Sequence, residues 1–116
     1  MQSWRLPEIE TPEGSRSPVV LLSENEARAV LIGLAPGQEL GDHQVKEHAW
    51  IVVVDGSAQL GAVAGETIDA SVGTLVHFEP DERHFVRSAQ GAKFLLLLAP
   101  WPGPGHFRGD AAAAAG

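Results

Sequence analysis

At 116 residues the chain has the length of one domain with a single core, and its 44% apolar residues are enough to fill that core. Eight Lys and Arg residues against fifteen Asp and Glu residues give a net charge of -7 without any basic cluster, so we expect no nucleic-acid partner. The absence of cysteine excludes disulfides, thiolate metal ligands and a cysteine nucleophile, and it fits the reducing cytoplasm, the localisation we expect. No segment reaches the ~20 apolar residues of a membrane span, so no membrane partner is expected either.

The predicted elements are short strands separated by turn residues. Residues 1–18 contain three prolines and predict an extended N-terminal arm. Strands are then predicted, in chain order, at 19–22, 27–35, 50–54, 57–63, 67–70, 74–78, 84–88 and 93–99. Asp55-Gly56 predicts a tight hairpin between two of them. The Pro/Gly run 100–105 ends regular structure, and 106–116 is expected to be a flexible C-terminal tail.

Strands of this length and spacing predict an all-β fold, a single antiparallel β-barrel or sandwich over residues 19–105. Helix should be confined to a turn or the tail. About eight to ten strands are expected, on the count of turn signals.

The stretch 37–56 opens with a glycine, contains His43 and His48, and continues through five apolar residues, 50–54, to Gly56. It resembles the first motif of the cupin superfamily, in which two histidines, a glutamate and a closing glycine follow an opening glycine. His43 falls on the first histidine and Gly56 on the closing glycine. Val45 stands at the second histidine position and Ala49 at the glutamate position. The resemblance therefore implies a cupin (jelly-roll) barrel that lacks two of the family's four usual metal ligands.

A second stretch, residues 73–88, resembles the other cupin motif, and His84 falls on its histidine. The resemblance implies that His84 enters from a strand facing the first motif. Together with His43, Val45 and Ala49 it would line a ligand-binding pocket inside the barrel.

Two interpretations of this pocket remain open. In one, His43 and His84, helped by His48 through a local bulge or by Glu47, weakly hold a divalent transition metal such as Fe, Mn, Ni or Zn. In the other, the histidines only line the pocket and bond to each other, to water or to a bound organic acid. Strand alternation places His48 outward, on the side opposite Ala49, which weakens its case as a ligand.

These interpretations lead to two functional hypotheses. The first is a binding module that holds a small organic molecule in the barrel cavity with weak or no metal. The second is a metal-dependent enzyme, a small dioxygenase or isomerase, that uses His43 and His84 with further ligands. Val45 and Ala49 favour the first, because they replace ligands with apolar side chains.

Other polar residues near the motifs are expected to be solvated. His77 alternates with the more apolar Val76 and Phe78 and is assigned to the surface or to an interface. The acidic residues of the two loops are expected to face water; they are Glu47, Glu79, Asp81 and Glu82.

The strand segments 50–54 and 94–98 are apolar on both faces, whereas a strand exposed on one side should alternate. A cover for the second face is therefore predicted. We expect a homodimer, with Trp4 and Trp101 as candidate interface anchors. The alternative is that the N-terminal arm and the Pro/Gly segment fold back over the same surface.

Overall fold

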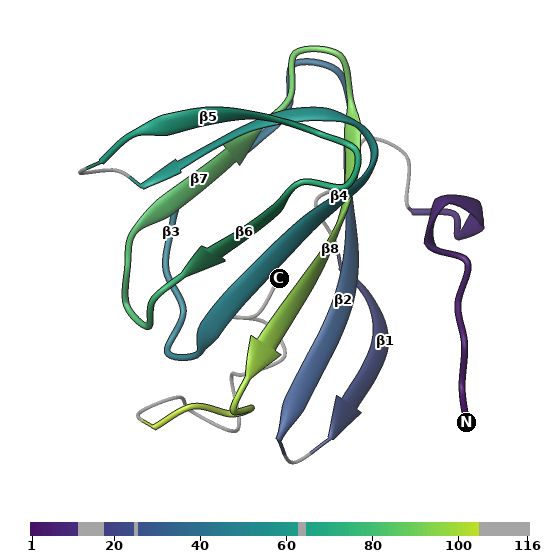
Figure 1. Ribbon diagram of the computed structural model, residues 1–116, viewed down its shortest axis with the longest axis vertical. Helices are drawn as coiled ribbons and strands as arrows, with labels where there is room; N and C mark the ends of the chain where they lie inside the picture. Colours follow the sequence, from purple (N-terminus) through teal and green to yellow (C-terminus); the bar gives the residue numbers. More distant parts are fainter. Residues whose placement is uncertain (12–17, 25, 63–64, 105–116) are drawn as a thin grey trace.

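The computed structural model of the chain describes residues 1–11, 18–24, 26–62 and 65–104. These residues form a short 3-10 turn and eight antiparallel strands that curl into a half-barrel (Figure 1). The elements are η1 (Leu6–Glu8), β1 (Val19–Glu24), β2 (Ala27–Leu34), β3 (Glu39–His43), β4 (His48–Ala62), β5 (Thr67–Ser71), β6 (Leu75–Phe78), β7 (His84–Arg87) and β8 (Ala92–Ala99). The predicted all-β antiparallel architecture is confirmed. The predicted tail, 106–116, lies outside the described residues.

Strand β4 organises the barrel because its two halves belong to different parts of the sheet. Its first half pairs with β8 on one side and β6 on the other, and its second half pairs with β7 and β5. The order along the main path is β1-β2-β8-β4-β7-β3. A single 15-residue strand thus joins the two walls of the half-barrel.

The hairpin predicted at Asp55-Gly56 is wrong. Residues 55 and 56 lie within the continuous strand β4 and do not form a turn. The pairing of β4 with β8 instead shifts register between Val53 and Asp55. Gly56 has φ +74, a left-handed conformation that favours glycine, and a Cβ there would collide with the backbone of Gly91. The glycine therefore marks a bulge where β4 bends from one wall to the other.

The core lies between the walls and is built from the inward residues of strands that alternate strictly. Along β4, Ala49, Ile51 and Val53 point into the core, while the residues between them are only half-buried. Strand β8 follows the same pattern, with Phe94, Leu96 and Leu98 inward and their neighbours on the outer face.

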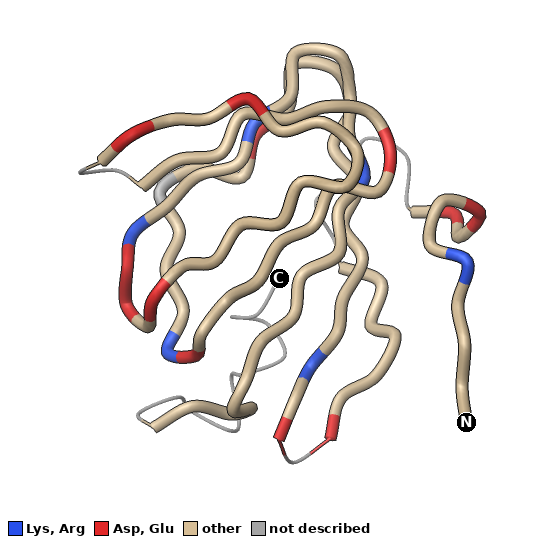
Figure 2. The backbone as a smooth tube through the Cα atoms, in the orientation of Figure 1, with Lys and Arg blue, Asp and Glu red and all other residues tan. Residues whose placement is uncertain are grey.

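The outer face of β6, β4 and β8 is apolar and partly uncovered. Leu75 is 64% exposed and Leu97 39% exposed, and Figure 2 shows that charged residues gather mainly in the turns and strand ends. The N-terminal segment covers a neighbouring part of the sheet: the Lys93 ammonium on β8 donates to the carbonyl of Pro7, and Thr11 packs against Gly33 on β2. The N-terminal segment therefore covers only part of the outer surface of the sheet.

The Pro/Gly segment after β8 returns to the barrel, and this overturns two sequence predictions. Trp101 is buried in the core of its own chain, so it is not an interface anchor. Glu47 is 0% exposed, not a solvated loop acid. The backbone N–H of Gly103 donates to Glu47 Oε2 at 2.7 Å, and the Arg28 guanidinium lies over the Trp101 ring, 4.7 Å from its centroid.

Within the described ranges no helix is long and apolar enough to cross a bilayer.

Candidate functional sites inside and outside the barrel

The two motif histidines meet inside the barrel. His43 ends β3 and His84 begins β7, and they are direct partners in the antiparallel pairing of these strands. Their ring centroids are 5.5 Å apart and the rings are nearly perpendicular, at 81°. They come from neighbouring strands, so the prediction that His84 enters from a facing strand is wrong.

The tautomer of His84 follows from its hydrogen bond. Its Nδ1 lies 2.9 Å from the carbonyl oxygen of Glu82, which can only accept, so Nδ1 carries the proton. In the neutral ring, Nε2 is then left with a lone pair. Phe78 stacks on the same ring, with centroids 4.2 Å apart and planes 11° from parallel. This combination holds the ring in one orientation.

His43 carries a buried polar atom without a partner. Its Nε2 is removed from solvent and has no hydrogen bond to any of the described residues. Leaving a buried polar atom unsatisfied costs about 1–3 kcal/mol. A site that keeps such an atom is suited to a group that can bond with it.

Burial also keeps both imidazoles uncharged. Desolvation lowers the pKa of His43 below its ordinary value, and the neighbouring His84 lowers it further. Desolvation likewise lowers the pKa of His84, and the Glu82 carbonyl and carboxylate only partly oppose this. At neutral pH the pair therefore offers uncharged imidazoles, the form that accepts hydrogen bonds and binds metals.

The remaining predicted pocket residues are apolar core residues. Val45 and Ala49 are buried in the core cluster beside Phe78. A cavity of about 670 Å³ lies elsewhere, against β4, β5 and β7, where Asp69 and Arg87 are part of its lining. None of the four predicted pocket residues lines that cavity.

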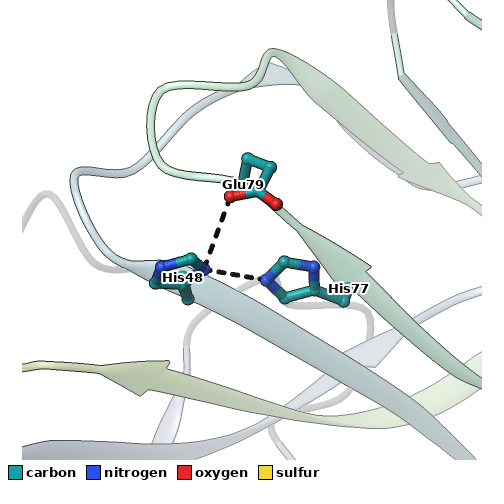
Figure 3. A group of neighbouring side chains, drawn as sticks. All are labelled: His48, His77 and Glu79. Atoms are coloured by element: carbon teal, nitrogen blue, oxygen red, sulfur yellow. Dashed lines mark hydrogen bonds and ion pairs between the residues drawn. The ribbon is translucent and has the colours of Figure 1, made fainter.

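A second group of side chains gathers on the outside of the barrel (Figure 3). His48 at the start of β4, His77 on β6 and Glu79 just after β6 each offer a ligand atom, and these atoms lie within 4.8 Å of one another. His48 Nδ1 is 2.9 Å from His77 Nε2 and 3.7 Å from Glu79 Oε2. His48 thus belongs to this outer cluster, which it forms without His43 or His84.

Sequence reasoning missed this outer cluster. His77 and Glu79 alternate onto one face of a strand, which is a usable signal within the sequence. The decisive fact is the pairing of Trp50 with His77 across β4 and β6, which brings His48 alongside. That register joins residues 27 positions apart and has no local signature.

Comparison with known proteins places the fold. Residues 30–99 match the family model described as "Cupin domain". The chain belongs to the cupin family. No curated protein sequence matches this cupin.

Many solved structures resemble this cupin. An uncharacterized conserved protein with a double-stranded β-helix domain from Klebsiella pneumoniae is 20% identical, with a TM-score of 0.75 over 89% of this chain and 93% of that one. An RmlC-like cupin from Desulfovibrio desulfuricans is 25% identical, with a TM-score of 0.75 over 86% and 97%. The DMSP lyase DddQ from Ruegeria pomeroyi is 15% identical, with a TM-score of 0.69 over 73% of this chain and 47% of that one. Likeness to the Klebsiella protein and to the lyase establishes the fold alone.

Proposed function

We propose that this cupin binds a small uncharged organic molecule through His43 and His84, with weak or no metal. The buried and unpartnered Nε2 of His43 is the observation that carries the proposal. A ligand group that bonds to this atom would remove the penalty of an unsatisfied buried polar group.

The chemistry of the pair defines the class of ligand. His84 Nε2 can only accept a hydrogen bond, because its proton is held on Nδ1 by the Glu82 carbonyl. Phe78 stacks on the His84 ring, Ala49 pairs with Phe78 across β4 and β6, and both belong to the apolar core together with Val45. A small molecule with a hydroxyl or amide group and an apolar body suits both features. Such a group can donate a hydrogen bond to His84 Nε2 and form a second hydrogen bond with His43 Nε2.

The lowered pKa values weigh against an organic acid at neutral pH. An anion would be attracted by imidazolium rings, whereas burial favours the neutral form of both His43 and His84. An acid would bind well only at pH values below the ordinary histidine pKa of ~6.5.

A metal-dependent enzyme is the second candidate, and one observation favours it. Metal-binding histidines commonly donate their second ring N–H to a carbonyl, as His84 does to Glu82. One structural neighbour, the DMSP lyase, is named as an enzyme, so the fold that it shares with this chain can host catalysis. Val45 and Ala49 leave only two imidazoles for the ion, so its affinity should be low.

The two candidates separate in one experiment on protein purified without an affinity tag. Mass spectrometry of the denatured protein should reveal a small molecule that co-purifies with the unmodified chain and with an outer-face control, His77→Ala. His43→Phe, which makes the pocket apolar, should abolish it. Elemental analysis should find well under one metal ion per chain at the interior site. One tightly held iron, nickel or zinc per chain that is lost in His43→Phe would instead establish the metal-dependent reading.

We also propose that this cupin forms a homodimer through the apolar outer face of β6, β4 and β8. The exposure of Leu75 and Leu97 supports this, because the N-terminal segment leaves these side chains open to solvent.

A further inference from the structure

The outer cluster His48–His77–Glu79 has the chemistry of a transition-metal site. It brings together two imidazoles and one carboxylate, a ligand set used by zinc in proteins. The three atoms approach within 4.8 Å of one another although they come from two strands. It is independent of the interior pair, which lies on β3 and β7.

Its distances are close to those of a loaded site. Zinc lies about 2.0–2.1 Å from imidazole nitrogen, so two ligands at a tetrahedral angle are about 3.3 Å apart. His48 Nδ1 is 2.9 Å from His77 Nε2 and 3.7 Å from Glu79 Oε2, which brackets this value. Side-chain shifts of a few tenths of an ångström would therefore suffice.

The fold holds these side chains in place. Trp50 pairs with His77 across β4 and β6, and the alternation of both strands puts His48 and Glu79 on the same outer face. The His48 ring stacks on Trp50, with centroids 5.7 Å apart, and the His77 ring is tilted by 42° to Trp50, with centroids 5.1 Å apart. Two paired strands and an aromatic ring thus orient the two imidazoles before an ion arrives.

We propose that His48 Nδ1, His77 Nε2 and a carboxylate oxygen of Glu79 bind one Zn²⁺ ion on the outside of the barrel. The hydrogen bond between the two imidazoles gives way to two metal bonds. The proton of this hydrogen bond moves, by exchange with solvent, to the other nitrogen of the ring that donated it, so both rings bind the ion as neutral imidazoles. Three protein ligands leave the fourth position for water or for a group from another molecule. The ion joins β4 to β6 and stabilises the native chain by mass action.

The test is calorimetric titration of untagged full-length protein with ZnCl₂ in a non-chelating buffer. The His43→Phe variant serves as the background, because it removes one histidine of the interior pair. This variant should bind one zinc ion per chain. Adding His77→Ala or Glu79→Gln should weaken binding at least ~10-fold, since even outer-shell partners of a metal contribute that much. The matched control, Glu66→Gln, changes an exposed acid between β4 and β5 and should leave zinc binding unchanged.

Histidine ¹⁵N NMR keeps the proposal falsifiable if a variant folds poorly. Zinc should shift Nδ1 of His48 and Nε2 of His77 in the unmodified protein, at one equivalent. The proposal is overturned if zinc shifts only His43 and His84. It is equally overturned if the variant with both His43→Phe and His77→Ala binds zinc as tightly as His43→Phe alone, or if His43→Phe alone binds none.

Discussion

The buried carboxylate of Glu47 offers the sharpest test of how the fold is held together. It is fully removed from solvent and accepts the Gly103 N–H, and it attracts the guanidinium of Arg28. Desolvation lowers the pKa of Arg28, and Glu47 partly restores it. Arg28 in turn lies over Trp101, so these groups tie the Pro/Gly segment to β2 and to the loop before β4.

Replacing Glu47 with alanine removes the buried carboxylate that accepts the Gly103 N–H and attracts the Arg28 guanidinium. Such a change typically costs about 3–5 kcal/mol, because the remaining charge is left uncompensated. The contact between Arg28 and Trp101 is present in both proteins, so it does not reduce this cost. We therefore expect Glu47→Ala to lower the free energy of unfolding by about 3–5 kcal/mol. The exposed control Glu66→Ala should change it by less than about 0.5 kcal/mol.

Urea denaturation followed by tryptophan fluorescence measures this change, and a double-mutant cycle isolates the pair. The cycle compares Arg28→Met, Glu47→Leu and the variant with both changes; the double variant replaces both charges with apolar side chains and should recover much of the lost stability. A loss below 1 kcal/mol for Glu47→Ala, or strictly additive effects in the cycle, would refute the argument that the two charges depend on each other.

Three further predictions concern the histidines and the outer face. Because burial lowers the pKa of His43 and His84, their contribution to stability should be complete above pH ~6.5 and decline as the pH falls below it. Urea denaturation from pH 8 to 5 should show a smaller loss of stability in the double variant with glutamine at both positions. An equal loss in the double variant would contradict the lowered pKa values. Val45→His with Ala49→Glu, introduced into His77→Ala so that the outer cluster does not contribute, should gain tight divalent-metal binding by calorimetry relative to His77→Ala alone, and its failure to do so would mean that these two side chains do not face the histidines. Leu75→Lys should turn a dimer into a monomer of 12.3 kDa by light scattering without loss of folding; a monomeric unmodified protein would end the dimer proposal.

The sequence was sufficient for the fold class because turn residues and strand alternation are local. The positions of Gly56 and His84 in the cupin motifs were also readable from spacing. The consequence assigned to Gly56 was wrong, since a left-handed glycine serves a bulge as well as a hairpin. Only the pairing of β4 with four other strands shows that Gly56 lies in a bulge and not in a hairpin turn.

The parts that escaped prediction depend on contacts between distant residues. Glu47 reads as a loop acid until Gly103, 56 positions later, returns to donate to it. His77 reads as a surface histidine until β6 pairs with β4 and places it beside His48. In both cases the neighbouring sequence is ordinary, and the chemistry arises from register and chain return.

The most direct test of the interior site is a ¹⁵N NMR titration of histidine-labelled protein. It reports which ring nitrogen of His43 and His84 carries the proton, and at which pH each ring becomes charged. Our account predicts that His84 is neutral at pH 7 with its proton on Nδ1, that both rings titrate below pH ~6.5, and that a bound small molecule shifts the Nε2 resonances of both. A His84 ring that is cationic at pH 7, or protonated on Nε2, would contradict it.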